Sequence, residues 1–502
     1  MLRVSASLLY LVLLSVGVAA QEAHDHGIPE QLGAVSFPTS CRAAVQAQFE
    51  RGVALLHSFA YSAAESAFRE VAEKDPSCAM AHWGIAMTYF HQLWDPPIAT
   101  SKIEAGHQEM ERAQQIGGGS ERERGFINAL SLIYATDPKL TYQSKLQSYT
   151  EAMQKLAAAD PHDVESQVFY ALALLASAPS SDKTHAYQKR AVVVLRPLYE
   201  QHPQHPGLAH YLIHACDNAE MAREGLPAAE AYAKIAPSAP HALHMPSHIF
   251  TRLGMWDDSI KSNLAAQAAA RKQGDTGEEL HAMDYLVYAY LQNGQDSEAA
   301  HVIQELKSMP ELSRGDFKVG YAVTAMPVRY TVERQQWADA AAIVPPPSTA
   351  PPHVIAIAVW ARGLGLACTG HAADARAQAA TLQQLEGQLH KVGHEYWAGQ
   401  VDIQRLEVLA WAAQAEGKSD DALALLREAA DTEDAVEKLP VTPGPIIPAR
   451  EQLGDLLLQL KQPQMALKEF QVSLRNAPGR RGATMGAARA TQLAEVTAKA
   501  LE

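Results

Sequence analysis

Several features that mark well-known classes of protein are scarce in this sequence. Its 502 residues include only four cysteines, and aromatic residues make up 7%. Few aromatic residues and many alanines favour close-packed helices over a β-sandwich. Basic residues are also outnumbered, because 42 Lys and Arg face 56 Asp and Glu and give a formal net charge of −14. We therefore expect no nucleic-acid partner, since phosphate binding needs clustered basic side chains.

The common motifs of nucleotide binding and hydrolysis are missing. The sequence contains no GxxxxGK[ST] phosphate loop, no GxGxxG opening a helix and no GxSxG nucleophile elbow. The closest string to the zinc-protease motif HExxH begins at His394 and lacks the second histidine. Nucleotide-dependent and serine-hydrolase functions therefore have no support in the sequence.

Long apolar runs are missing beyond the N-terminus, so no later segment is predicted to span a membrane. The first twenty residues combine Arg3, an apolar stretch from Leu8 to Val18 and small residues before Gln21. This pattern predicts a signal peptide over residues 1–20, with an uncleaved membrane anchor as the alternative. We expect an exported protein, periplasmic or extracellular, without a membrane span after cleavage.

The remaining chain repeats a pattern of small and large residues at the period of a two-helix unit. The clearest copies are Leu453, Gly454, Leu457, Ala466, Phe470 and Pro478; Gly52, Leu55, Ala64, Phe68 and Pro76; and Leu286, Tyr290, Ala299 and Ile303. This pattern resembles the tetratricopeptide repeat (TPR) family, and the stretch HALHMPSHIFTRLGMWDDSIKSN is similar to exported bacterial TPR proteins of unassigned role. The resemblance implies an all-α, TPR-like solenoid of stacked helical hairpins with a C-terminal capping helix.

The repeats and the prolines divide the mature chain into four parts. Residues 21–40 are predicted to form an extended N-terminal segment, followed by an N-terminal TPR-like array with a histidine-rich groove over 41–343. Residues 344–352 form a proline-rich connector that no helix can cross. A C-terminal TPR-like array with its capping helix is expected over 353–502.

Two of the cysteines flank one predicted hairpin. Cys41 lies just before it and Cys78 just after it, and a hairpin returns its two ends to the same side. In an oxidising compartment these two are a plausible disulfide pair. The alternative is that all four cysteines are small buried residues without a bond between them.

Histidines, of which there are 21, provide the main chemical signal. His210 and His214 are four residues apart, and His244 and His248 repeat this spacing, with His241 one turn earlier. Residues four apart on a helix project from one face with Cβ atoms roughly 5–6 Å apart. In TPR proteins the corresponding positions of the first helix of each unit face the concave groove. The resemblance therefore implies that these histidines form one patch, able to bind a divalent transition metal.

Four further residues are expected beside this patch. By the same register, Asp284, His281, Tyr288 and His57 are predicted to line the groove. Asp284 could complete a mixed nitrogen and oxygen shell, and His281 or Tyr288 are candidate acid or base groups. Without thiolates nearby, zinc, copper, iron and nickel are all chemically reasonable.

Two functions follow from these observations. The first is an exported binding scaffold that holds a protein, peptide or small ligand in its concave groove. The alternative is a metal-binding protein, or a metal-dependent hydrolase or oxidoreductase, built on the same scaffold. A single histidine of this kind is ordinarily a buried residue bonded to a backbone carbonyl, so the shared register of the whole set carries the second hypothesis.

Overall fold

The structure is a computed structural model that describes residues 30–93, 98–310, 312–315 and 317–499, and all regular elements in these ranges are helices. Before the proline-rich connector the helices are α1 (Ala43–His57), α2 (Tyr61–Lys74), α3 (Ala79–Met87), α4 (Thr100–Ile116), α5 (Glu121–Ile133), α6 (Tyr142–Ala159), α7 (Val164–Ser177), α8 (Ala186–Gln201), α9 (Pro206–Cys216), α10 (Ala222–Ile235), α11 (Pro240–His244), α12 (Pro246–Arg252), α13 (Trp256–Gln273), α14 (Thr276–Gln292), α15 (Asp296–Ser308), α16 (Phe317–Glu333) and α17 (Trp337–Ala341). After it come α18 (Pro352–Cys368), α19 (Ala372–Lys391), α20 (Glu395–Ala415), α21 (Ser419–Asp434), α22 (Ala449–Gln459), α23 (Pro463–Asn476) and α24 (Arg481–Lys499).

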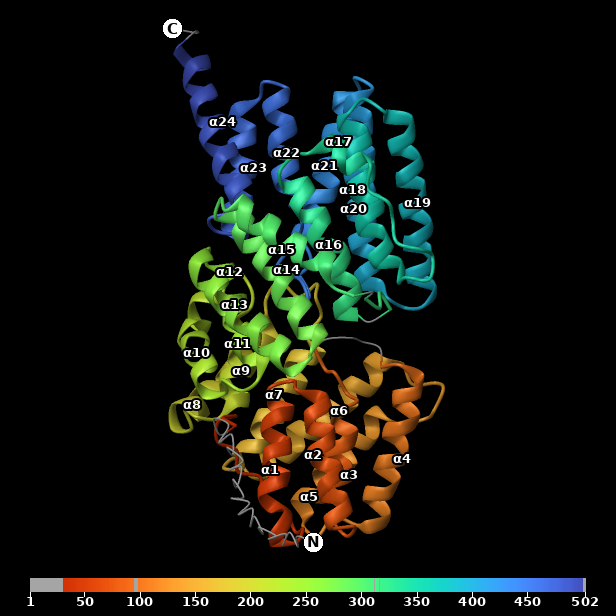
Figure 1. Cartoon of the computed structure of the whole chain (residues 1–502), viewed down its shortest axis with the longest axis vertical. Helices are drawn as coiled ribbons and strands as arrows, with labels where there is room; N and C mark the ends of the chain where they lie inside the picture. Colours follow the sequence, from red (N-terminus) through yellow and green to blue (C-terminus); the bar gives the residue numbers. More distant parts are fainter. Residues whose placement is uncertain (1–29, 94–97, 311, 316, 500–502) are drawn as a thin grey trace, which may run out of the picture.

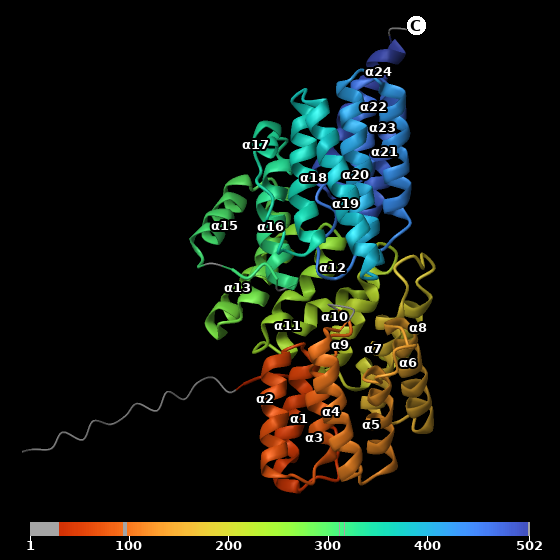
Figure 2. The same cartoon turned by 90° about the vertical axis from the view of Figure 1, so that its right-hand side faces the viewer.

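Neighbouring helices pack against each other as hairpins, and the hairpins stack in chain order. Helix α1 packs on α2, α13 on α14 and α22 on α23, while α24 packs on both α22 and α23. In Figure 1 the chain climbs from the red N-terminal helices at the bottom to the blue C-terminal helices at the top, and Figure 2 shows the same order after a quarter turn. The predicted fold class, an all-α solenoid of stacked helical hairpins with a terminal capping helix, is confirmed.

The two helices of a hairpin pack closely where a glycine of the repeat pattern faces an aromatic ring. A Cβ atom placed on Gly52 would lie 2.7 Å from the ring of Phe68, and one placed on Gly454 would lie 2.7 Å from the ring of Phe470. In both hairpins the missing side chain therefore lets the aromatic ring of the second helix rest on the backbone of the first. A Cβ atom placed on Gly486 of α24 would likewise lie 2.4 Å from the ring of Phe470.

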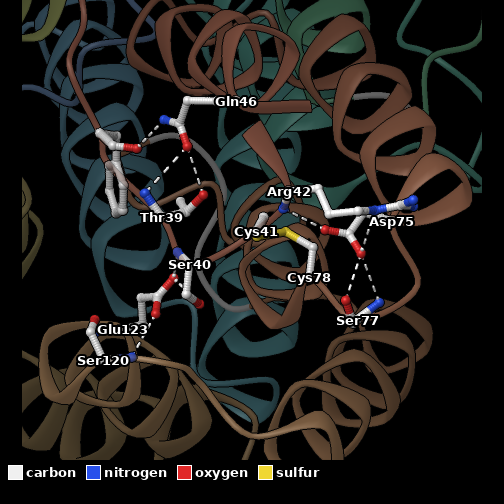
Figure 3. The surroundings of a disulfide bond; sticks show 11 residues. Thr39, Ser40, Cys41, Arg42, Gln46, Asp75, Ser77, Cys78, Ser120 and Glu123 are labelled. Carbon is white, nitrogen blue, oxygen red and sulfur yellow. Dashed lines mark hydrogen bonds and ion pairs between the residues drawn. A yellow bond between two sulfur atoms is a disulfide. The ribbon is translucent and has the colours of Figure 1, made fainter. Parts of the chain in front are cut away.

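A disulfide bond joins Cys41 and Cys78 across the first hairpin, as predicted (Figure 3). The Cα atoms of the two residues are 4.8 Å apart, and the bond closes a separation of 37 residues. Cys216 and Cys368 are free thiols.

The segment before α1 is anchored to the first hairpins by more than this bond. Ser40 donates its backbone N–H to the carboxylate of Glu123 at 2.7 Å, and Arg42 donates its own to Asp75 at 2.8 Å. The ring of Phe37 is fully buried among aromatic side chains of α1, α3 and α5. The segment 30–42 is thus tied to the N-terminal array, with Leu32 and Phe37 buried in its core.

Two connectors without helical structure shape the rest of the molecule. The proline-rich connector, predicted over residues 344–352, lies between α17 and α18, and its last residue, Pro352, is the first residue of α18. The second, which we call the return connector, comprises residues 435–448 between α21 and α22. It reaches back to the N-terminal array, where Tyr285 donates its hydroxyl hydrogen bonds to the carbonyls of Pro440 and Thr442, both at 3.2 Å.

None of the described helices combines sufficient length with sufficient apolar character to cross a bilayer. Residues 1–20, the predicted signal peptide, lie outside the described ranges.

Candidate metal centre

Six histidines from four helices form one buried group, which we call the histidine cluster. Its members are His210 and His214 on α9, His241 and His244 on α11, His248 on α12, and His281 on α14. They divide into a first triad (His210, His214, His241) and a second triad (His244, His248, His281), and within each triad the possible ligand nitrogens all lie within 4.8 Å of one another. All five histidines singled out by their spacing are therefore in one place, and His281 joins them.

Proline residues set the local register of these helices. Helices α9, α11 and α12 each begin with a proline at the first helical position, where its missing N–H costs no hydrogen bond. Met245, between α11 and α12, keeps helical dihedral angles of φ −54° and ψ −34°. His244 and His248 therefore remain one turn apart across the junction, with ring centroids separated by 4.9 Å.

The two triads are contiguous. The ring centroids of His241 and His244 are 6.0 Å apart, and those of His214 and His248 are 6.1 Å apart. Such dense packing of imidazoles is costly when the rings are protonated, because like charges repel in a medium of low dielectric constant. The cluster is therefore built for neutral imidazole, the form that binds metals.

Acceptors around the cluster fix the tautomers of three rings. The Nδ1–H of His244 donates to Asn263 Oδ1 at 2.6 Å, that of His248 donates to Asp217 Oδ2 at 2.9 Å, and that of His210 donates to the carbonyl of His57 at 2.6 Å. The amide of Asn263 is itself oriented, because its Nδ2 donates to the carbonyl of Ser259 at 2.8 Å. Each of these rings therefore carries its hydrogen on Nδ1 and a lone pair on Nε2.

With the hydrogens on Nδ1, one contact in the second triad brings two lone pairs together. The Nε2 atoms of His244 and His248 are 3.0 Å apart, and both present a lone pair to the other. Burial lowers the pKa of His248 to about 4 and holds the pKa of His244 well below its ordinary value, so a shared proton does not explain the contact near neutral pH. A metal ion with bonds of about 2.0–2.1 Å to nitrogen accommodates two such atoms at this separation.

The first triad offers free ligand atoms as well. Among the described residues, His210 Nε2 and His214 Nε2 are buried and have no hydrogen-bond partner. Burial, reinforced by neighbouring histidines, holds the pKa of both rings well below the ordinary value. Two neutral imidazoles on adjacent turns of α9 therefore hold unused lone pairs in the interior, where an unsatisfied polar atom is costly.

Carboxylates surround the cluster, but each has cationic partners. Asp217 is paired with Lys438 at 2.8 Å and with Arg252 at 2.8 Å, while Glu278 accepts from Lys318. Although burial opposes ionisation, Lys438 and Arg252 hold the pKa of Asp217 well below its ordinary value, and Lys318 does the same for Glu278. Asp217 orients His248, and Glu278 orients His241 through a hydrogen bond of 3.2 Å. The ligand set offered to an ion therefore consists of imidazoles.

A third group nearby, which we call the His57 network, has a different character. His57 Nε2 and His205 Nε2 both donate to Glu165, at 2.9 and 3.0 Å. The remaining nitrogens are also partnered, because Tyr211 lies 3.0 Å from His57 Nδ1 and the N–H of Leu208 donates to His205 Nδ1 at 3.3 Å. All four ring nitrogens are satisfied without an ion, so this network is read as structural.

The other residues predicted to line the groove are buried in the molecule. Asp284, proposed for the metal shell, forms an ion pair with Arg329 at 3.5 Å, and Tyr288 accepts a hydrogen bond from Arg480 at 3.4 Å. His57 belongs to the His57 network. Asp284, Tyr288 and His57 are each no more than 3% exposed, so in this structure they face interior partners rather than an open groove.

Sequence reasoning missed the residues that orient the rings. Asp217 and Glu278 lie three residues from histidines of the cluster, but each bonds a histidine of a different helix, 31 and 37 residues away. Asn263 lies on α13, which carries no histidine of the cluster. No local pattern indicates these pairings, since they depend on how the hairpins pack.

Comparison with known proteins gives no related sequence and only distant similarity to solved structures. No family model matches the sequence, and no curated protein is significantly similar to it. Among solved structures, the TPR domain of P58(IPK) is 13% identical over 91% of this chain and 99% of its own, with a TM-score of 0.23. Yeast Tom70 is 10% identical over 89% and 88%, with a TM-score of 0.34. Human IFIT1 bound to PPP-AAAA is 12% identical over 77% and 72%, with a TM-score of 0.35. The fold assignment therefore rests on the packing of the chain's own helices.

Proposed function

We propose that this protein is an exported metal-binding protein whose histidine cluster holds one transition-metal ion in each triad. The observation that carries the proposal is the 3.0 Å contact between the lone-pair nitrogens of His244 and His248. The orienting acceptors on their Nδ1 atoms support it, since such acceptors regularly accompany metal-ligating histidines. Neutral imidazole ligands suit zinc, copper, iron and nickel, and copper binds such ligands most tightly in the divalent series.

Export is part of the proposal. The N-terminal pattern of residues 1–20 predicts a signal peptide. The Cys41–Cys78 disulfide supports an oxidising compartment, because such bonds are rare where thiols are kept reduced. A periplasmic or extracellular location follows.

The binding-scaffold function has less support from the predicted groove. Its four predicted lining residues, His57, His281, Asp284 and Tyr288, are buried, so a partner protein or peptide has no access to them in this structure. Catalysis also stays a prediction. A three-imidazole shell leaves one coordination position for water or substrate, which hydrolases and oxidoreductases both use.

Metal analysis of the purified chain tests the proposal. The protein is expressed without an affinity tag in media supplemented separately with zinc, copper and iron, and its metal content is measured by inductively coupled plasma mass spectrometry. We expect about two equivalents per chain of the preferred metal, and a higher unfolding temperature in the loaded than in the chelated protein. His214→Ala removes about one equivalent from the first triad, and His248→Ala about one from the second.

Two controls distinguish the centre from adventitious binding. His301→Ala changes an exposed histidine whose side chain is 75% accessible, and it should leave the metal content unchanged. His205→Gln alters the His57 network and should also leave both equivalents in place. Substoichiometric metal that neither triad variant alters would refute the proposal.

A further inference from the structure

A partly open cavity of about 350 Å³ lies between the two arrays, apart from the histidine cluster. Its lining comes from α12, α14, α16, α18, α20, α21, α22 and α23, from the return connector, and from the loops on either side of α8 and α9. None of the six clustered histidines lines it. A volume of this size holds a small organic molecule.

One wall of the cavity is aromatic. Tyr321, Trp360, Tyr396 and Trp397 all line it, and the ring centroids of Tyr396 and Trp397 are 5.1 Å apart. Trp397 is stacked on His353, with centroids 4.5 Å apart and an interplanar angle of 19°. Such π faces attract cations and accept apolar groups, but they repel anions.

Two carboxyl groups line the same space, and among the described residues neither forms an ion pair. Glu407 is 2% exposed and accepts hydrogen bonds from Trp360 Nε1 at 2.6 Å and from Gln452 Nε2 at 2.7 Å. Glu433 accepts from the backbone N–H of Ala449 at 2.9 Å. Among the described residues, no lysine or arginine forms an ion pair with either carboxyl group.

The surroundings of Glu407 and Glu433 raise the pKa of both carboxyl groups. Burial, together with the neighbouring Glu433, holds the pKa of Glu407 well above its ordinary value, and burial raises the pKa of Glu433 to about 7. Basic side chains elsewhere in the lining are already engaged. Arg450 is bound by Asp431, Asp434 and Glu469, and Lys438 by Asp217. Glu407 therefore lacks a neighbouring cation that would stabilise its ionised form, and at Glu433 the charges of Arg480 and Arg450 do not offset the effect of burial.

Unused hydrogen-bond acceptors complete the site. Ser473 lines the cavity, is 2% exposed and has no partner for its hydroxyl oxygen among the described residues. The buried amide oxygen Oε1 of Gln404, also in the lining, has none either. A ligand that brings several N–H donors would satisfy these atoms as well as the carboxylates.

We propose that this cavity binds a small organic amine in its protonated form, with the ammonium group at Glu407 and Glu433 and the apolar body against Trp360 and Trp397. A primary ammonium group supplies three N–H donors, which a quaternary ammonium group lacks. The charge complements the carboxyl groups, and the aromatic wall accepts the hydrocarbon part. The site is separate from the metal centre and does not depend on it.

Calorimetric titration of the full-length protein with three molecules of one shape tests this assignment. The probes are phenethylamine, which is protonated at neutral pH, the neutral phenethyl alcohol and the anionic phenylacetate. We expect the amine to bind at least about tenfold more tightly than the alcohol, and phenylacetate to bind weakest, because only the charge and the donors differ. Equal affinity for all three, or no binding of the amine, would overturn the assignment.

Isosteric variants show whether the carboxyl groups are responsible. Glu407→Gln and Glu433→Gln keep the size of the side chain, and each should weaken binding of the amine by about tenfold with little effect on the alcohol. Glu428→Gln is the matched control, because it removes the same charge from an exposed position of α21. Circular dichroism verifies that all three variants are folded. An unchanged preference for the amine in both cavity variants would contradict the proposal.

Discussion

At the scale of single residues, Asp217 connects the histidine cluster to the rest of the molecule. Its carboxylate accepts the Nδ1–H of His248 and is held between Arg252 and Lys438. It thereby fixes the tautomer that leaves the lone pair of His248 on Nε2. The ring nitrogen of His248 that keeps a lone pair is thus decided by a residue that does not itself belong to either triad.

Replacement of this carboxylate should weaken one metal site selectively. In Asp217→Asn we expect the affinity of the second triad to fall by about 10–100-fold, because the orienting acceptor of His248 loses its charge. The first triad should retain its affinity. Competition with a chromophoric chelator measures both steps on folded protein, and Asp258→Asn, an exposed carboxylate of α13, serves as control. Equal weakening of both triads would point to a general loss of packing instead.

The histidines themselves could be predicted from the sequence, whereas their partners could not. The four-residue spacing of His210 with His214 and of His244 with His248 is a local helical property, so it survives in the fold. The ion pair of Asp284 with Arg329 depends on the contact of α14 with α16. The positions of residues along α14 alone therefore predicted Asp284 as a metal ligand, and they could not reveal its ion pair with Arg329.

At the scale of helices, the pairing of a glycine with an aromatic ring is the repeated device of this fold. Gly454 and Phe470 belong to the sequence copy that is easiest to recognise, and the structure brings them into direct contact. Periodic small and large residues carry this information locally, which explains why the hairpins were predictable. The return connector has no such periodicity, and its hydrogen bonds to Tyr285 join residues 155 and 157 positions apart.

Two glycine-to-alanine substitutions measure how much the close approach of glycine and ring contributes to stability. Gly454→Ala places a Cβ 2.7 Å from the ring of Phe470, and we expect a loss of about 1–3 kcal/mol in the free energy of unfolding. Gly387→Ala on α19 meets nothing within 4 Å, so it should stabilise the protein by about 0.5–1 kcal/mol through helix propensity. Urea titrations followed by circular dichroism give both values. A loss in both variants would show that close approach is not the cause.

At the scale of the whole molecule, covalent and ionic links hold distant parts of the chain together. The Cys41–Cys78 bond attaches the segment before α1 to the first hairpin. The return connector joins the two arrays through Lys438 and Glu437, which pair with Asp217 and His185. The first link was foreseen from the positions of the cysteines around a predicted hairpin. The second was not, because a connector without helical pattern carries no signal for where it packs.

Removal of the disulfide should destabilise the N-terminal array. A cross-link over 37 residues restricts the unfolded chain, and its loss in the double variant Cys41→Ser, Cys78→Ser should cost about 3–4 kcal/mol. The change is measured as a lower urea midpoint by tryptophan fluorescence, since Trp83 packs near Phe37 in the same array. Cys368→Ser, which changes a free thiol, is the control. An unchanged midpoint would mean that the contacts of residues 30–42 suffice without the bond.

The link between Asp217 and Lys438 spans 221 positions of the chain. A fragment that ends before the return connector would contain every histidine of both triads and still lack one of the two cations that balance Asp217. During synthesis the six imidazoles emerge long before the lysine that completes their surroundings, so the buried environment of the cluster is complete only when the return connector packs against the N-terminal array.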